Sequence, residues 1–191
     1  MCYYTSCNNA NGGKTLMAEK KTVFLTGASG HMGWAGFKEL YKKKDKLNIV
    51  LLLRDSEKNR KKFANYLNDP SVKIVWGDLK KYDDVLKCVE GSDYILHVGG
   101  MVSPSADYYP TRTIQTNTGA ARNIVDAVKA QPNKDDIKVV YIGTVAQTGD
   151  RNAPIHWART GEPIKISIYD HYAISKTIAE SIFAESGLKH W

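Results

Sequence analysis

The sequence predicts an α/β protein with a doubly wound parallel sheet, and two observations carry this prediction. Short apolar runs that suit buried strands alternate along the chain with longer segments whose apolar residues have helical spacing. The first apolar run leads into three glycines spaced three apart, Gly27, Gly30 and Gly33. Parallel strands need crossover connections, and right-handed crossovers leave a sheet with helices on both faces as the natural arrangement.

The expected strands are short, rich in aliphatic and β-branched residues, and of the kind that is covered on both faces. They span residues 23–25, 47–53, 72–76, 94–98 and 137–142. Helices are expected directly after Gly33, over 56–68 with Ser56 as the N-cap, over 83–90, over 111–131 behind Pro110, and over 170–186. A sixth strand is expected to open at Leu188.

Length and composition favour one domain in a reducing, aqueous compartment. The 191 residues, of which 42% are apolar, suffice for a well-buried core. The sequence has no apolar run of about 18 residues, the length that would span a membrane. Residues 1–20 are polar and unpatterned, so we expect a disordered leader followed by the domain in residues 21–191. Cys2, Cys7 and Cys88 are odd in number and lack metal-ligand spacing, which favours the cytoplasm and predicts no metal site.

The net charge of +7 does not predict a nucleic-acid partner. The lysines are spread over several segments and mixed with acidic residues, as on solvated helix faces. The sequence has no basic run interleaved with aromatic residues, which single-strand binders require.

The glycine-rich turn is the strongest functional signal. A turn without Cβ atoms, between a buried strand and the start of a helix, lets a pyrophosphate lie against backbone N–H groups at the positive end of the helix dipole. The spacing G-x-x-G-x-x-G differs from the general G-x-G-x-x-G fingerprint, so the flanking strand and helix carry the interpretation. The structural alternative is a flexible turn.

The end of the second strand bears on the choice of cofactor. In a dinucleotide fold this position lies near the adenosine ribose, where an acidic side chain binds the 2′-hydroxyl and an arginine pairs with a 2′-phosphate. Arg54 comes first after the apolar run and favours NADP, whereas Asp55 beside it keeps NAD open. Alternatively, both residues only precede the helix that Ser56 caps.

The end of the fourth strand offers a second close approach for a ligand. Val98 leads into Gly99 and Gly100, which leave room for a ligand near the backbone, although a plain turn would use them too. His97 is interpreted as a packed strand residue. The long segment 144–169 is predicted to be an active-site loop, because loops of this length usually carry function.

The order of these motifs resembles the extended short-chain dehydrogenase/reductases, the NAD(P)-dependent epimerases, dehydratases and reductases with a Rossmann-like fold. The similarity covers roughly residues 20–191. It rests on Thr-Gly27-x-x-Gly30-x-x-Gly33, Gly77-Asp78-Leu79, His97-Val-Gly-Gly100, Asn117, Thr144 and Tyr172-Ala-Ile-Ser-Lys176. The chain departs from the family pattern at Gly99-Gly100, where alanines are common, and at Thr148-Gly149, which replaces Tyr-Gly.

The resemblance implies a nicotinamide dinucleotide as the cofactor and a catalytic trio of Thr144, Tyr172 and Lys176. The predicted cofactor-binding residues are Gly27, Gly30, His31, Met32, Gly33, Arg54, Asp78, Leu79, Val98, Gly99, Gly100, Asn117, Tyr172 and Lys176. Asn117 would also support the helix that carries the catalytic pair.

The chemistry explains the pairing of Tyr172 with Lys176. Residues four apart on a helix face the same side. A phenol with an ordinary pKa of about 10 needs a nearby cation to act as a base near neutral pH, and the ammonium one turn away supplies that charge. Thr144 would hydrogen-bond the substrate oxygen. The alternatives are an ordinary solvated pair on the helix and a capping hydroxyl at Thr144.

Two function classes follow. The favoured one is an oxidoreductase or epimerase that moves hydride between the nicotinamide and a small-molecule carbonyl or hydroxyl substrate. The alternative is a non-catalytic dinucleotide-binding or protein-interaction module. Family resemblance also implies a possible homodimer through helices like those at 111–131 and 170–186. It further implies a carboxyl-terminal substrate domain, which we expect to be missing from these 191 residues, so that the pocket for the substrate is incomplete.

Overall fold

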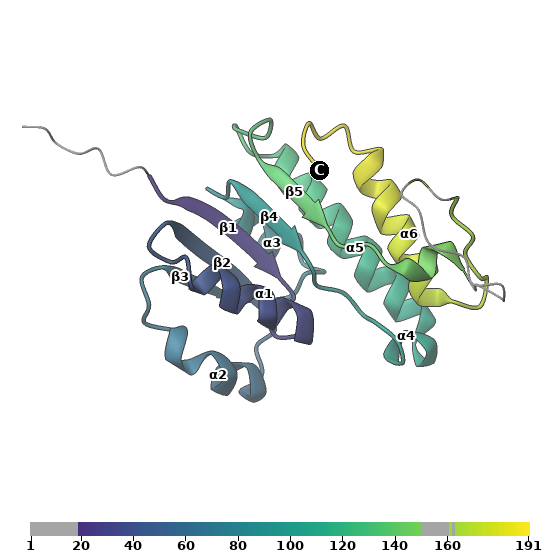
Figure 1. Ribbon diagram of the computed structural model, residues 1–191, viewed down its shortest axis with the longest axis horizontal. Coiled ribbons are helices and arrows are strands. Elements are labelled where there is room, and N and C mark those ends of the chain that lie inside the picture. The colour runs from purple at the N-terminus through teal and green to yellow at the C-terminus, as the bar shows by residue number, and fades with distance from the viewer. Residues whose placement is uncertain (1–18, 150–160, 162) are drawn as a thin grey trace, which may run out of the picture.

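The computed structural model describes residues 19–149, 161 and 163–191, and its sheet confirms the predicted fold class (Figure 1). The strands lie in the order β3-β2-β1-β4-β5, and all neighbours are parallel. Their bounds are β1 Lys21–Thr26, β2 Leu47–Leu53, β3 Val72–Trp76, β4 Tyr94–His97 and β5 Lys138–Tyr141. The strand order reverses between β1 and β4, and such a switch point is where doubly wound sheets bind ligands.

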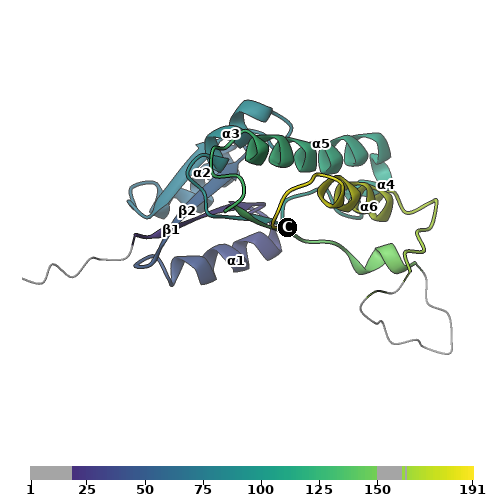
Figure 2. The ribbon, with the colours of Figure 1, turned by 90° about the horizontal axis from the view of Figure 1, so that it is seen from above.

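Helices cover both faces of the sheet. Viewed from above, α1 lies on one side, and α3 and α5 lie on the other (Figure 2). The helices are α1 His31–Tyr41, α2 Glu57–Phe63, α3 Tyr82–Val89, α4 Ser105–Tyr108, α5 Pro110–Lys129 and α6 His171–Ala184, with short 3₁₀ turns η1 Ala64–Tyr66 and η2 Val145–Thr148. No helix among the described residues has the length and apolar character that crossing a bilayer would require.

Each face of the sheet has its own core. On the α1 side, four aromatic rings pack around Phe37, which is fully buried. Its ring lies 4.8 Å from that of Tyr66 at an interplanar angle of 85°, an edge-to-face arrangement that favours aromatic pairs. On the opposite side, aliphatic residues of α3, α5 and α6 pack on the sheet. Both cores exclude water from the strands, as the continuous apolar runs predict.

The structure departs from the expected elements mainly in short turns. Ser56 caps α2 as predicted, with its Oγ accepting a hydrogen bond from the Asn59 N–H at 3.2 Å. The helix expected over 56–68 is shorter, because α2 ends at Phe63 and the chain tightens into η1. Neither α4 nor η2 was expected, since one-turn elements have no hydrophobic period to reveal them.

The two predicted irregular segments fall largely outside the described residues. The leader expected over 1–20 is described only at residues 19 and 20, and the loop 144–169 lacks description at 150–160 and 162. No strand is assigned over the described residues 188–191. The Val139 N–H nevertheless donates to the His190 carbonyl at 3.1 Å, so this segment lies along the outer edge of β5.

The aromatic core gives a direct test of the packing. Phe37→Ala removes a fully buried ring whose neighbours are themselves large, so the site cannot collapse around the cavity. We expect the free energy of unfolding to fall by about 3–5 kcal/mol, measured by urea denaturation. The control Tyr108→Ala, at a ring that is 77% exposed, should change it by about 0.5 kcal/mol or less. Equal effects of the two substitutions would contradict this packing.

Candidate functional site

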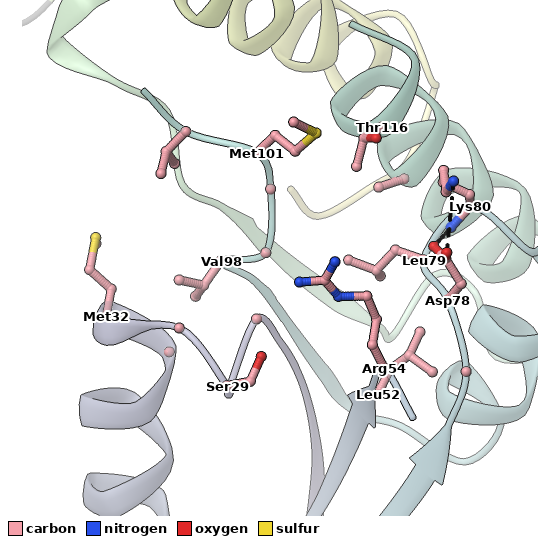
Figure 3. Close-up of a pocket in the computed structure, with 18 of the residues that line it drawn as sticks. Ser29, Met32, Leu52, Arg54, Asp78, Leu79, Lys80, Val98, Met101 and Thr116 are labelled. Carbon is pink, nitrogen blue, oxygen red and sulfur yellow. Dashed lines mark hydrogen bonds and ion pairs between the residues drawn. The ribbon is translucent and has the colours of Figure 1, made fainter. Parts of the chain in front are cut away.

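A cavity of about 550 Å³ opens at the carboxyl ends of β1, β2, β3 and β4, beside the point where the strand order reverses (Figure 3). This volume is ordinary for a cofactor or small-molecule site. Eleven of the predicted cofactor-binding residues line it: Gly27, Gly30, His31, Met32, Gly33, Arg54, Asp78, Leu79, Val98, Gly99 and Gly100. The structure therefore brings together, in one cavity, residues that come from four different strand ends.

Nine residues beyond the predicted cofactor-binding set complete the lining. The additional residues are Ser29, Leu52, Gly77, Lys80, Met101, Val102, Arg112, Thr116 and Ala120. Arg112, Thr116 and Ala120 follow one another at intervals of four on α5, so one face of this helix forms a wall of the cavity. That spacing was a usable signal once the helix had been placed.

The glycine turn lets two backbones meet at the floor of the cavity. Gly27 has φ +75°, and a Cβ there would lie 2.6 Å from the Gly99 Cα. A Cβ at Gly33 would overlap the Gly27 carbonyl group, so α1 also starts directly against the turn. Side chains at Gly27 or Gly33 would force the β1 turn, the β4 turn and α1 apart.

The amino terminus of α1 is suited to an anion. Gly30 is its N-cap, and among the described residues no side chain caps it and no acidic residue lies in the first turn. The first N–H groups of a helix have no partner within it, and they carry the positive end of the dipole. His31, Met32 and Gly33 line the cavity here, so a phosphate group in the cavity would meet these groups.

Cations dominate the charge of the cavity. Arg54, Lys80 and Arg112 line it, against the single acidic residue Asp78. The Asp78 carboxylate already accepts the Lys80 N–H at 2.9 Å and lies 3.8 Å from the Lys80 ammonium. Figure 3 shows the Arg54 side chain projecting from the end of β2 into the cavity. The net positive charge suits a ligand with several phosphates.

Asp55, the acidic residue that would favour NAD as the cofactor, pairs with Arg60 outside the cavity. Its carboxylate accepts two hydrogen bonds from the Arg60 guanidinium, at 2.6 and 2.7 Å, which lower the pKa of Asp55. Asp55 is not among the residues that line the cavity. The Arg60 guanidinium also lies 4.8 Å from the centre of the Trp76 ring, which holds the pair over β3.

Lys62 adds a cation beside the glycine turn, and no sequence motif indicated it. Its Nζ donates to the Ser29 carbonyl at 2.9 Å and lies 4.4 Å from the centre of the Trp34 ring. Burial lowers the pKa of Lys62. The contact joins α2 to the turn, and only the folded chain brings these residues together.

His97 is confirmed as a packed strand residue. It is 1% exposed, and its Nδ1 lies 2.8 Å from the Thr26 Oγ1, which also accepts the Gly99 N–H at 2.9 Å. Burial, helped by the charge of Lys176, lowers the pKa of His97 to about 3. A neutral imidazole whose Nδ1 accepts a hydrogen bond from the Thr26 hydroxyl satisfies this arrangement. The Thr26 oxygen in turn fixes the Gly99 backbone at the cavity floor.

Asn117 connects the cavity to α6. Its Oδ1 accepts the Met101 N–H at 2.7 Å, while its Nδ2 donates to the Met101 carbonyl at 3.0 Å and to the Ser175 Oγ at 2.8 Å. The side chain is 2% exposed and lies outside the cavity lining. Asn117 thus contacts the helix that carries Tyr172 and Lys176, while direct cofactor binding by Asn117 stays a prediction.

Tyr172 and Lys176 lie one turn apart on α6. Lys176 is 5% exposed, and its ammonium lies 4.1 Å from the centre of the Tyr141 ring. Burial lowers the pKa of Lys176 to about 8, and the Glu180 carboxylate opposes that shift. The Tyr141 hydroxyl donates to the Lys176 carbonyl at 2.9 Å, which ties α6 to β5.

Thr144 follows β5 as the N-cap of η2. Its Oγ1 accepts the Ala146 N–H at 3.3 Å, so the hydroxyl has the capping role that was the structural alternative, and its proton can still be donated elsewhere. Thr144, Tyr172 and Lys176 do not line the cavity, although all three are among the described residues. The catalytic assignment of these residues stays a prediction.

A comparison with protein families matches residues 23–190 of the chain to the NAD dependent epimerase/dehydratase family. The chain belongs to this family. The match confirms the resemblance to extended short-chain dehydrogenase/reductases that the motifs indicated.

Individual relatives agree with the family. A UDP-glucose 4-epimerase of Rickettsia bellii is 32% identical over 128 residues, which cover 65% of this chain and 36% of the relative. The chain thus spans about a third of the length of the curated relatives it matches.

Solved structures share the fold. The Bordetella bronchiseptica enzyme WbmH in complex with NAD+ has a TM-score of 0.70 at 24% identity, covering 89% of this chain and 54% of that chain. A Thermus thermophilus UDP-glucose 4-epimerase complex with NAD has a TM-score of 0.69 at 17% identity, covering 87% and 50%.

The lowered pKa of Lys176 predicts a specific dependence of stability on pH. Folded Lys176 loses its proton near pH 8 and unfolded Lys176 near its ordinary pKa of 10.5, so between these values the unfolded chain binds more protons. The lysine therefore destabilises the fold at pH 7, and this effect fades as the pH rises. Lys176→Met lacks this effect. Its free energy of unfolding minus that of the parent chain should therefore fall by about 3 kcal/mol between pH 7 and about 10.5.

The measurement is urea denaturation of both chains across this pH range. Lys61→Met, at a side chain that is 78% exposed, is the matched control and should give a difference that does not vary with pH. A pH-independent difference for Lys176→Met would show that this ammonium is not desolvated.

Proposed function

We propose that the protein is an NAD(P)-dependent oxidoreductase or epimerase of the extended short-chain dehydrogenase type. In this proposal it moves hydride between the nicotinamide and a carbonyl or hydroxyl group of a small molecule. The observation that carries the proposal is the cavity at the strand switch point, with its glycine turn, uncapped helix terminus and cationic lining. The family match supports it, because the family is described by NAD dependent epimerases and dehydratases.

The described residues fit a dinucleotide on physical grounds. The glycine turn leaves the α1 N–H groups accessible to a pyrophosphate, and Arg54, Lys80 and Arg112 balance its charge. When bound, the nicotinamide supplies the hydride donor or acceptor. Tyr172 would take or give the proton at the substrate oxygen, the Lys176 ammonium would favour its phenolate, and the Thr144 hydroxyl would hydrogen-bond the same oxygen.

The proposed cofactor preference is for NADP. Arg54 projects into the cavity from the end of β2, where a 2′-phosphate would lie, while Asp55 is occupied by Arg60. Lys62, at the Ser29 carbonyl, brings a second cation to this side of the turn. The similar solved structures described above contain NAD and do not support this preference. The preference therefore rests on these side chains alone.

Sugar nucleotides are the first substrates to test, since the relatives reported above are UDP-glucose 4-epimerases. The non-catalytic alternative is not favoured, because a module that only binds a dinucleotide would not need Thr144, Tyr172 and Lys176 together. The cysteine usage supports a cytoplasmic location. A homodimer through α5 and α6 is proposed from the family resemblance.

Replacement of Arg54 tests the cofactor assignment. Arg54→Ala should weaken NADP binding about 10- to 100-fold, the effect of losing a charge-assisted hydrogen bond, and leave NAD affinity within about twofold. Isothermal titration calorimetry measures both affinities. The control Lys61→Ala, at an exposed lysine paired with Glu57, should change neither. Tighter binding of NAD than of NADP by the parent chain would move the assignment to NAD.

Replacement of Tyr172 tests the chemistry separately from binding. Tyr172→Phe removes only the hydroxyl, so turnover should fall about 10²- to 10⁴-fold while dinucleotide affinity stays within about threefold. Turnover is followed by absorbance of the reduced nicotinamide and by epimerisation of UDP-glucose, in the whole protein. Tyr169→Phe, at a ring that is 82% exposed two residues before α6, is the matched control. Undiminished turnover in Tyr172→Phe would rule out this residue as the acid or base.

A further inference from the structure

Gln147 joins the end of β5 to α6 through both ends of its side-chain amide. Its Oε1 accepts the Thr144 N–H at 3.0 Å, and its Nε2 donates to the Glu180 carboxylate at 2.6 Å. The residue is 6% exposed, and its carbonyl accepts the Lys165 N–H at 2.9 Å. An amide with these bonds has one defined orientation, because its acceptor and donor ends face different partners.

Glu180 occupies the position one helical turn after Lys176, as Tyr172 occupies the one before. Its carboxylate favours the charged form of Lys176, and burial together with the Glu180 charge raises the pKa of Tyr141 on β5. The same carboxylate therefore bonds the Thr144 segment through Gln147 and acts on the lysine through its charge.

We propose that Gln147 and Glu180 are a positioning pair that clamps Thr144 against α6, so that the Thr144 hydroxyl keeps a fixed relation to Tyr172 and Lys176. The proposal rests on the proposed function, which gives those three residues the chemistry. In the proposed reaction, neither Gln147 nor Glu180 touches the reacting atoms. Gln147 positions Thr144. Glu180 positions Gln147 and favours the charged form of Lys176.

Thr144 depends on such a clamp because it lies outside the strand pairing of β5. It lies beyond the last residue of β5, Tyr141, as the N-cap of the four-residue 3₁₀ turn η2. Strand pairing therefore does not fix it. The space at Gly143 is consistent with a tight pair, because a Cβ there would lie 3.0 Å from the Gln147 Oε1 and 3.7 Å from the Glu180 Oε2.

Few titratable groups surround Lys176 and Glu180, so the effect of the Glu180 charge on Lys176 can be isolated. Among the described residues these are His97 of β4, whose pKa is lowered by burial and by the Lys176 charge, Tyr141 of β5, whose pKa is raised by burial and by the Glu180 charge, and Tyr172, one turn before Lys176 on α6. His97 is neutral near pH 7, and burial keeps Tyr141 protonated, so within this group the Glu180 carboxylate is the charge that favours the charged form of Lys176. Removing its charge should make Lys176 release its proton at lower pH.

The first experiment measures amide hydrogen exchange at Thr144 by NMR, which needs no turnover. Gln147→Leu removes both hydrogen bonds at nearly constant volume, and Thr144 exchange should accelerate about tenfold, the value of one lost hydrogen bond. Gln131→Leu is the matched control, because its amide donates to the Ala127 carbonyl near the end of α5, far along the chain from Thr144. Unchanged Thr144 exchange in Gln147→Leu would overturn the clamp.

Exchanging the amide and the carboxylate between positions 147 and 180 distinguishes loss of the clamp from a general loss of structure. Gln147→Glu alone sets two carboxylates against each other and should release Thr144, whereas Gln147→Glu with Glu180→Gln restores a donor opposite an acceptor and should restore protection. Failure of the double substitution to restore protection, in a chain with the parent melting temperature, would also overturn the proposal.

The second experiment measures turnover of the whole protein across pH. Gln147→Leu should lower kcat about tenfold and leave the KM for the dinucleotide within about twofold, because only the Thr144 position changes. Glu180→Gln keeps the hydrogen bond, so Thr144 stays protected while the alkaline loss of activity moves to lower pH. Parent-like kcat and pH profile in both variants would overturn the positioning role. A parent protein that binds the dinucleotide without turnover would overturn the proposed function, while Thr144 exchange would still decide the clamp.

Discussion

The backbone contact between Gly27 and Gly99 determines where this protein can bind a ligand. β1 and β4 are neighbours in space but far apart in sequence, and their carboxyl ends turn toward each other with no Cβ between them. The Thr26 hydroxyl and the His97 ring lock this contact from beneath, where water cannot compete for their hydrogen bonds. With the two turns held together, α1 must start at the cavity and direct its unpaired N–H groups into it.

Burial then separates the charges into two regions. The cavity keeps its cations at the surface, where Arg54 is exposed and can meet a phosphate. Beneath the sheet edge, His97 and Lys176 are both buried, with opposite consequences. His97 gives up its proton and becomes a structural acceptor, whereas Lys176 keeps its proton near neutral pH because Glu180 and the Tyr141 ring compensate part of the lost hydration. A buried lysine that stays charged near neutral pH is suited to influence a neighbouring phenol, because solvent screens its charge poorly inside the protein.

Much of the fold was predictable because local sequence specified it. β2 and β3 have the predicted bounds, Ser56 caps α2, and most of the cavity floor was identified from glycines and strand ends. The contacts that depend on tertiary structure were not predictable. Lys62 reaches Ser29 across 33 residues, and Gln147 reaches Glu180 across the same separation, with no local pattern to mark either pair. Thr144 was identified by its place after β5, but its capping bonds became visible only in the folded turn.

Asn117 explains how the cavity and α6 can act as one unit although the catalytic candidates lie outside the cavity lining. Its amide bonds the backbone of Met101, which lines the cavity, and the hydroxyl of Ser175, which lies between Tyr172 and Lys176 on α6. Ser175 in turn donates to the Tyr172 carbonyl at 2.8 Å, so the chain of bonds reaches the residue assigned the proton. All of these groups are buried or half-buried, and losing one partner would leave the others unpaired at a cost of about 1–3 kcal/mol. These hydrogen bonds therefore give the loop after β4 and α6 a direct contact, through which a movement of one can affect the other.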